Sequence, residues 1–207
     1  MAKNPNKVAD SRATAERFDA QYYERFYRRA KTRVHAPRKV HALAAGVTGL
    51  LEWWGAPLRT VLDVGAGTGE WGRWLAEHRP AVRYRSTEYS AYACAQYGHE
   101  QRDIARWRAA ARFDLVVCQG VLPYLADADC ASALENLAAM TRGFLYLEAI
   151  TASDLADVCD VGLTDVAVHR RKGTFYARRL APHFTKVGAG LYYRKDGPLL
   201  FYELERA

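Results

Sequence analysis

Hydrophobic residues in the central part of the chain form short apolar runs that alternate with amphipathic stretches. The apolar runs predict buried strands, and the amphipathic stretches predict helices. In chain order, the predicted elements are a strand at 60–64, a helix at 69–78, a strand at 82–88, a helix at 90–97, a short strand at 99–103, a strand at 113–118, a helix at 129–141 and a strand at 143–149. This alternation favours an α/β fold, in which helices cover both faces of a doubly wound, mostly parallel sheet.

The segment before this core is predicted to be helical. Residues 1–10 are polar and are expected to form a disordered tail. Residues 15–30 place five aromatic rings on one stripe of a helix, and Ala36 to Trp54 predict a second helix with Pro37 in its first turn. The stripe is typical of a helix docked on a core, and equally of a lid over a site. Its rings belong to Phe18, Tyr22, Tyr23, Phe26 and Tyr27.

The segment after the core has a weaker pattern. Residues 151–172 lack a clear period and predict a loop with a short helix, which is followed by a helix at 174–182. Residues 186–194 and 199–204 both predict strands. Because the tight-turn dipeptide Asp196-Gly197 separates them, we expect a terminal antiparallel hairpin there.

The most specific motif is a glycine turn between the first predicted strand and the helix after it, in the run VLDVGAGTGEW of residues 61–71. Asp63 lies within the strand, and Gly65, Gly67 and Gly69 follow with the spacing G-x-G-x-G. Glycines let the backbone pass close to a ligand because no Cβ intervenes. Glu88 ends the next strand, 19 residues after Gly69, where a carboxylate can accept hydrogen bonds from ribose hydroxyls.

With Glu88 downstream, this run resembles the class I S-adenosylmethionine-dependent methyltransferases. The resemblance covers residues 57–150, and it includes Arg102-Asp103-Ile104, the strand 113–118 with its following loop, and the strand 144–148. It implies a seven-stranded sheet with a C-terminal antiparallel hairpin and an N-terminal helical lid. The domain implied by the resemblance covers residues 11–207, with a helical cap at 11–56, a cofactor-binding core at 57–150 and an acceptor-side segment with the terminal hairpin at 151–207.

The cofactor implied by this resemblance is S-adenosylmethionine. Its methionine part and sugar would lie over the glycine turn, with Asp63 orienting them. Its ribose hydroxyls would bind Glu88, and its adenine would be bordered by Asp103 and Ile104. The implied cofactor-binding residues are Asp63, Gly65, Ala66, Gly67, Gly69, Glu88, Tyr89, Asp103, Ile104, Gln119, Leu122 and Tyr22.

Methyl transfer is an in-line displacement, so the protein mainly has to align donor and acceptor and exclude water. A general base is needed only where the acceptor holds its proton tightly. The candidates are Glu148 at the end of the fifth strand and His169 in a basic segment, whose imidazole suits neutral pH. Tyr23 could face the sulfonium from the lid. Each of the three residues could instead be structural.

The net charge of +7 is unevenly distributed. Residues 1–41 carry +7 and residues 167–195 carry +8, so the remainder carries −8. A basic cover over the acceptor site would suit an anionic acceptor, whereas the same charges could be ordinary surface. Among them, Arg170, Arg171, Arg178 and Arg179 could grip an anion or line a solvated surface.

Several classes are disfavoured by the rest of the chain. No apolar run approaches the ~20 residues that a membrane helix needs, and no signal-peptide pattern occurs, so a cytoplasmic protein without a membrane partner is expected. The four cysteines are scattered, which predicts no metal site. The acid in the first strand disfavours a dinucleotide oxidoreductase.

We expect methyl transfer to an oxygen or nitrogen of a small molecule, which could be anionic. The alternatives are an RNA, protein or peptide methyltransferase that uses the basic flanks, and a non-catalytic S-adenosylmethionine-binding protein. The oligomeric state stays open.

Overall fold

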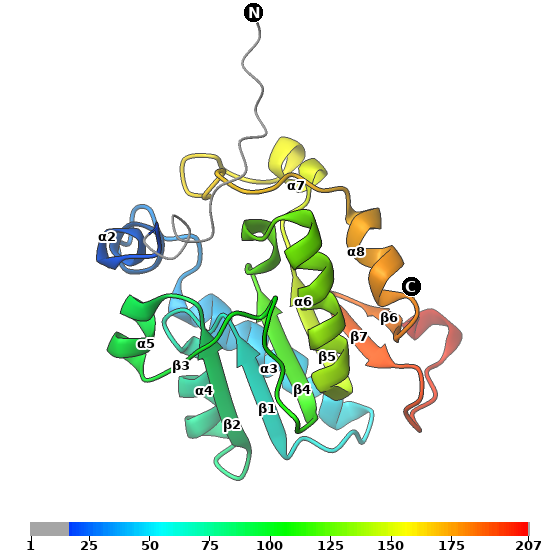
Figure 1. Cartoon of the computed structure of the whole chain (residues 1–207). Coiled ribbons are helices and arrows are strands. Elements are labelled where there is room, and N and C mark those ends of the chain that lie inside the picture. Colours follow the sequence, from blue (N-terminus) through cyan, green and yellow to red (C-terminus); the bar gives the residue numbers. More distant parts are fainter. Residues whose placement is uncertain (1–16, 207) are drawn as a thin grey trace, which may run out of the picture.

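A seven-stranded sheet forms the centre of the molecule in the computed structural model, which describes residues 17–206 (Figure 1). Its strands lie in the order β3-β2-β1-β4-β5-β7-β6. Strands β1 to β5 are parallel, and β7 runs antiparallel to both β5 and β6. The strands are β1 (Thr60–Val64), β2 (Arg83–Glu88), β3 (Glu100–Gln101), β4 (Phe113–Gln119), β5 (Thr141–Glu148), β6 (Phe184–Gly188) and β7 (Leu191–Arg194).

Helices cover both faces of this sheet, as the alternation of elements predicts (Figure 1). Strand residues alternate between the two faces, so each face has its own apolar core. One core joins the sheet to α3 and α4, and the other joins it to α6 and α8. The helices are α2 (Ala20–Tyr23), α3 (Pro37–Trp53), α4 (Glu70–His78), α5 (Ala91–Tyr97), α6 (Asp127–Met140), α7 (Ala152–Asp157) and α8 (Gly173–Leu180), with a π-helix η1 (Glu24–Arg28) and 3₁₀ turns η2 (Leu122–Tyr124) and η3 (Glu203–Glu205).

The N-terminal lid consists of α2 and η1 within the described residues. In η1 the Arg29 N–H reaches the Glu24 carbonyl at 2.9 Å, the five-residue step of a π-helix. This turn is therefore wider than a turn of the regular α-helix predicted for residues 15–30. The predicted tail at 1–10, and the start of that helix up to residue 16, lie outside the described residues.

The terminal hairpin exists, but the predicted turn and second strand are wrong. The turn lies at Gly188, Ala189 and Gly190, all with positive φ, inside the single strand predicted at 186–194. Residues 199–204 form no strand within the described chain.

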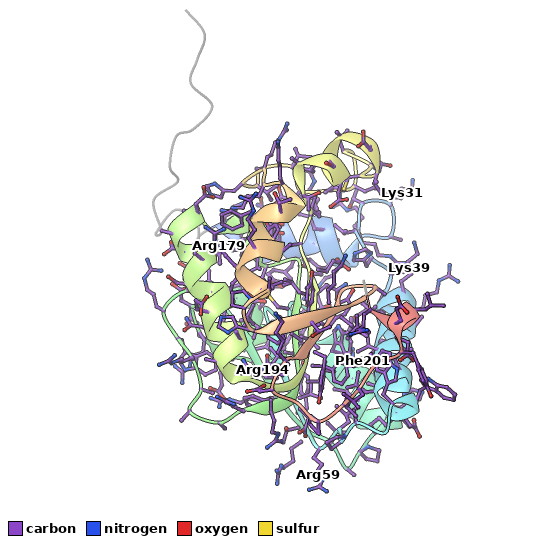
Figure 2. All side chains as sticks on the ribbon, turned by 90° about the vertical axis from the view of Figure 1, so that its right-hand side faces the viewer. Lys31, Lys39, Arg59, Arg179, Arg194 and Phe201 are labelled. Atoms are coloured by element: carbon purple, nitrogen blue, oxygen red, sulfur yellow. The ribbon has the colours of Figure 1, made fainter. Side chains whose placement is uncertain are left out.

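The C-terminal segment packs on α3 instead (Figure 2). The Phe201 ring lies 5.2 Å from that of Trp54, and Glu205 accepts a hydrogen bond from the Trp54 indole at 3.1 Å. Asp196 pairs with Arg194 rather than shaping a hairpin turn. Aromatic packing against the helix therefore replaces strand pairing for this apolar segment.

Two other element boundaries differ from prediction. Strand β3 is confined to two residues, because Asp103 starts a turn in which its carbonyl accepts from Arg106 and Trp107 N–H groups. Helix α6 begins at Asp127 rather than 129, with Ala126 at its N-cap, so neither Asp127 nor Asp129 caps it.

Candidate functional site

The glycine turn connects the carboxyl end of β1 to α4, and two of its positions require glycine. Gly65 and Gly67 have φ of +71° and +58°. A Cβ on Gly65 would lie 2.1 Å from Cγ2 of Val121, and a Cβ on Gly67 would lie 3.2 Å from Cε1 of Tyr27. The loop after β4 and the lid therefore both pack directly against the turn, so closely that only glycine fits at these two positions.

Backbone hydrogen bonds fix this turn on the neighbouring strand. The N–H groups of Gly65 and Ala66 donate to the Thr87 carbonyl of β2 at 2.8 and 3.1 Å. Gly69, with φ of +78°, is the N-cap of α4. The turn is thus held rigidly between β1 and β2, as a site for a closely approaching ligand requires.

Sequence reasoning did not identify His99, which also holds the turn. Its Nε2 lies 3.1 Å from the Gly67 carbonyl, and its Nδ1 lies 2.8 Å from Ser86 Oγ. Burial lowers the pKa of His99, which favours a neutral imidazole bridging the two groups. The sequence offers no distinctive signal for this role, since His99 is an isolated histidine before a short strand.

Glu88 closes the turn on the β2 side. The residue is 8% exposed, and its Oε2 accepts from the Gly67 N–H at 2.9 Å. Its Oε1 accepts from the N–H groups of Tyr89 and Ser90 at 2.7 and 3.1 Å. A carboxylate offers about four lone-pair sites, so capacity is left for a ligand hydroxyl beside the turn.

Asp63 is buried beneath the turn, on the α3 and α4 side of the sheet. It is 2% exposed and accepts a hydrogen bond from the Tyr84 hydroxyl at 2.7 Å. Burial raises the pKa of Asp63 to about 7, against the effect of that hydrogen bond. The structure thus gives Asp63 a structural partner, and its predicted role in orienting the cofactor stays a prediction.

The segment after β3 borders the same edge of the sheet. Asp103 accepts from the Ala105 N–H at 2.9 Å and pairs with Arg106 at 2.5 Å. The Ile104 side chain is 5% exposed and packs in the core that faces α6. The Tyr89 carbonyl accepts from the Gln101 amide at 3.2 Å, so this segment and the end of β2 are joined.

Gln119 and Leu122, which were both predicted to bind the cofactor, differ in their surroundings. Leu122 is fully buried, so its side chain belongs to the core. Gln119 ends β4 and links α4 to β5: its amide oxygen accepts from the Trp71 indole at 3.3 Å, and its amide nitrogen donates to Glu148 at 3.3 Å.

The lid is attached to two of the loops that end at this edge. The hydroxyls of Tyr22 and Tyr124 are 2.8 Å apart, and the Ser90 hydroxyl donates to the Phe18 carbonyl at 2.5 Å. Burial raises the pKa of Tyr22, so its phenol stays protonated. Helix α2 consequently lies over the carboxyl ends of the strands (Figure 1).

The lid is also attached to the segment before α8. Arg17 pairs with Asp165 at 2.5 Å and donates to the Ala167 carbonyl at 2.7 Å. These two contacts span about 150 residues of sequence, with separations of 148 and 150 positions. The N-terminal segment therefore lies directly against residues 165–167.

Tyr23 is enclosed rather than facing an acceptor. It is 2% exposed, and its ring stacks on that of Tyr27 with centroids 5.0 Å apart. Burial raises its pKa, with Glu88 adding to the effect. Tyr27, which sequence reasoning did not select, lies against the glycine turn. The catalytic role predicted for Tyr23 stays a prediction.

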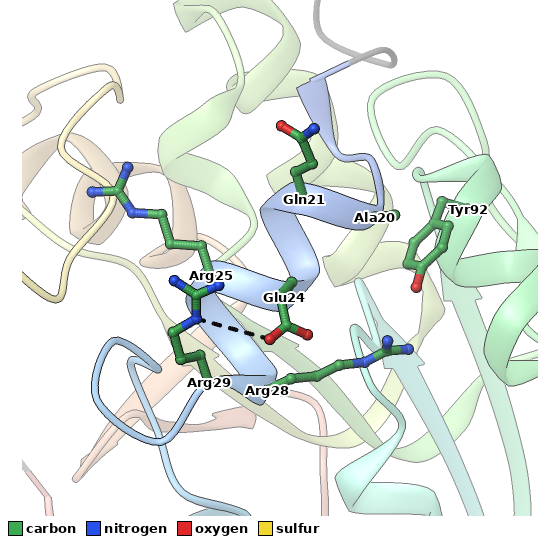
Figure 3. Close-up of a pocket in the computed structure, with 7 residues that line it drawn as sticks. All are labelled: Ala20, Gln21, Glu24, Arg25, Arg28, Arg29 and Tyr92. Atoms are coloured by element: carbon green, nitrogen blue, oxygen red, sulfur yellow. Dashed lines mark ion pairs between the residues drawn. The ribbon is translucent and has the colours of Figure 1, made fainter.

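The outer surface of the lid is basic (Figure 3). Arg25, Arg28 and Arg29 line a groove of about 460 Å³ with Tyr92 of α5. Glu24 offsets part of this charge, with its carboxylate 3.9 Å from Arg29 Nε.

Glu148 lies at the carboxyl end of β5, directly across from Gln119 in register. Although burial favours a higher value, its pKa is below the usual range because His35, Tyr146 and Gln119 stabilise the carboxylate. The Tyr146 hydroxyl donates at 3.1 Å, and His35 Nε2 lies 3.8 Å away. A carboxylate that stays ionised is a weak base, so Glu148 is better suited to stabilise a nearby cation.

His169 lies beside the loop after β4, where its backbone N–H donates to the Pro123 carbonyl at 2.8 Å. Burial and the nearby Arg171 lower its pKa, which keeps its imidazole neutral near pH 7. Its position is compatible with the acceptor side, and its role as a base stays a prediction.

Arg171 has a structural role, contrary to the prediction that it could bind an anion. It is 5% exposed, and it donates to the Leu122 carbonyl at 3.1 Å, to the Leu125 carbonyl and to Asp127 at 2.7 Å. Arg179 lies over the Phe175 ring at 3.7 Å. These two arginines stabilise the acceptor-side segment and are not free to bind an anion.

Residues 17–206 contain no group of three or more histidine, cysteine or acidic side chains arranged to hold a metal ion. No helix in the same range is long and apolar enough to cross a membrane.

Comparison with family models gave a match over fewer than half of the residues. A family model described as "Methyltransferase domain" matches residues 62–142, which include the glycine turn and Glu88. A comparison with curated proteins gave no significant match.

Solved methyltransferase structures share the fold. Magnesium protoporphyrin IX methyltransferase from Synechocystis PCC 6803, with bound S-adenosylhomocysteine, aligns with a TM-score of 0.63 and 15% identity over 90% of this chain and 100% of that one. The sugar N-methyltransferase KedS8 from Streptoalloteichus sp. ATCC 53650 aligns at 0.57 and 19% identity, over 94% and 98%. The amino pentose methyltransferase CalS10 from Micromonospora echinaspora aligns at 0.59 and 15% identity, over 80% and 94%. The predicted fold is thereby confirmed.

Proposed function

We propose that this chain is a class I methyltransferase that transfers a methyl group from S-adenosylmethionine to an oxygen or nitrogen of a small molecule. The methyltransferase-domain match over residues 62–142 and the strand order of the sheet support this proposal. The observation that carries this proposal is the glycine turn closed by Glu88 beneath the lid. The cofactor supplies an activated methyl group and a neutral thioether leaving group.

The residues of the turn are compatible with this cofactor. Gly65 and Gly67 have no Cβ and positive φ, and Glu88 beside them keeps acceptor capacity for ribose hydroxyls. Asp103 follows β3 at the same edge, where an adenine would lie. S-adenosylhomocysteine bound in a neighbour of the same fold supports this assignment.

The protein's main contributions in this proposal are alignment and exclusion of water. The lid contacts of Tyr22 and Arg17 hold the N-terminal segment over the carboxyl edge of the sheet. Where the acceptor must lose a proton, His35 beside the ionised Glu148 is better placed to take it than Glu148 itself. His169 is the second candidate.

A small-molecule acceptor is favoured over RNA or protein because several arginines of the basic flanks already have partners within the chain. Arg171 and Arg179 are occupied in internal contacts, and Arg17 is paired with Asp165. Neighbours whose names include sugar and porphyrin substrates are consistent with small acceptors. An RNA or protein methyltransferase and a non-catalytic binding protein are the alternatives, and a cytoplasmic location stays part of the proposal.

The test is formation of S-adenosylhomocysteine from S-adenosylmethionine with panels of amino sugars, hydroxylated aromatics and carboxylated compounds. A folded RNA and a peptide library serve as rival acceptors. Turnover with a small molecule supports the proposal, and turnover with RNA or peptide alone contradicts its acceptor class. Tight cofactor binding without turnover on any panel would favour the non-catalytic alternative.

A further inference from the structure

A pocket of about 490 Å³ lies at the amino ends of the strands, away from the glycine turn. Its lining includes Thr60 at the start of β1, Arg83 at the start of β2 and Phe113 at the start of β4. The turn follows the carboxyl end of β1, which spans five residues. At ~3.3 Å per residue, the pocket and the glycine turn are therefore about 16 Å apart.

Arginines mark the amino ends of four consecutive strands here. Arg83 begins β2, Arg59 and Arg112 directly precede β1 and β4, and Arg142 is the second residue of β5. Register pairs Thr60 with Arg83 and Phe113 with Thr141, so these positions form one row along the edge. Figure 2 shows Arg59 at the far end of the molecule from Lys31, which follows the lid.

Carboxylates neutralise only part of the positive charge around this pocket. Asp114 accepts two hydrogen bonds from Arg142, at 2.6 and 2.9 Å, and these help to lower its pKa against the effect of burial. Glu100 binds Arg85 bidentately, at 2.7 Å for each bond.

Two guanidinium groups in the lining of this pocket are left without such partners. The side chains of Arg83 and Arg112 are exposed and form no hydrogen bond or ion pair with residues 17–206. Asp196, whose pKa is lowered to about 2 mainly by Arg194, adds a weaker attraction for Arg112. The pocket therefore keeps an excess of positive charge.

We propose that this amino-edge pocket binds a small molecule carrying a diphosphate group. Strands β2 and β4 flank β1, and Arg112 lies two residues before the position of β4 that is level with Arg83. At ~4.8 Å per strand and ~3.3 Å per residue, the two arginines therefore start about 12 Å apart. Two guanidinium forks at this spacing can converge on the two ends of one diphosphate, each binding oxygen atoms bidentately. The volume lies in the range of about 300–1,000 Å³ that is usual for small-molecule sites.

The test is calorimetric titration of the whole chain with inorganic pyrophosphate at about 0.15 M salt, where exposed charges are largely screened. Arg83→Gln/Arg112→Gln should weaken binding at least about tenfold, or 1.4 kcal/mol. The matched control is Arg25→Gln/Arg29→Gln on the outer surface of the lid, which removes the same charge (Figure 3) and should change affinity less than about twofold. Orthophosphate should bind more weakly than pyrophosphate.

No pyrophosphate binding by a folded wild-type protein overturns the proposal, and so does an equal loss in both double variants, which indicates non-specific attraction. Tighter binding of a single-stranded RNA that pyrophosphate does not displace would assign the row to nucleic acid instead. Binding of S-adenosylhomocysteine should be unchanged in the Arg83→Gln/Arg112→Gln variant, so failure of this site is distinguishable from failure of the proposed methyltransferase function.

Discussion

Replacing Gly65 with alanine tests how closely the glycine turn is packed. At φ of +71°, a Cβ adds about 1–2 kcal/mol of backbone strain. The same Cβ would lie 2.1 Å from Val121 Cγ2, an overlap whose relief costs about 1–3 kcal/mol. Gly65→Ala should therefore lower the free energy of unfolding by about 2–5 kcal/mol.

Gly98→Ala is the matched control for this prediction. Gly98 ends α5 with φ of +77°, and nothing lies within 4 Å of the point where its Cβ would stand, so the variant should show the backbone strain alone. Both substitutions reduce the entropy of the unfolded chain equally, and that effect cancels. Urea unfolding followed by circular dichroism measures the difference, expected at about 1–3 kcal/mol.

A double-mutant cycle separates the two costs at Gly65. In a Val121→Ala background, Gly65→Ala should lose the overlap cost and keep the backbone strain. The reasoning is refuted if Gly65→Ala and Gly98→Ala differ by less than about 0.5 kcal/mol, or if the cycle shows no coupling.

Three other residues give independent predictions. The folded-state pKa of Asp63 is raised from 3.8 to about 7, so its contribution to stability is largest below pH 4 and is lost as pH rises through 7. Asp63→Asn should remove up to about 4 kcal/mol of this pH dependence of the free energy of unfolding. Urea unfolding between pH 4 and 8 measures it, and an unchanged profile would contradict the prediction. Arg171→Met should lower the free energy of unfolding by about 2–4 kcal/mol by leaving buried carbonyls unpaired, whereas the exposed Arg170→Met should change it by less than about 0.5 kcal/mol. His99→Ala should weaken binding of S-adenosylhomocysteine about three- to tenfold by releasing the Gly67 carbonyl; unchanged affinity by calorimetry would show that His99 does not hold the turn.

Local sequence signals were sufficient for the central elements. The apolar runs of β1, β4 and β5 are buried on both faces, which makes them unambiguous, and the glycine spacing identifies the turn because its backbone conformation excludes other residues. The acids at the ends of β1 and β2 follow from the same local pattern.

The errors came from contacts between residues far apart in the sequence. The stretch 199–204 has strand-like composition, but its partner is Trp54 at the C-cap of α3, about 150 residues earlier. The role of His99 depends on a carbonyl 32 positions away, and Arg171 acts on a loop 46 to 49 positions before it. The spacing of hydrophobic residues along the sequence does not predict such distant partners.

The central claim is tested most directly by calorimetric titration with S-adenosylhomocysteine. Wild-type protein should bind it with micromolar affinity, and Glu88→Ala should weaken binding by at least about tenfold, or 1.4 kcal/mol. Glu88→Gln, which keeps one acceptor oxygen, and the exposed Glu135→Ala serve as controls for folding and for charge. Absence of binding to folded wild-type protein, or equal affinity in the Glu88→Ala variant, would contradict the account.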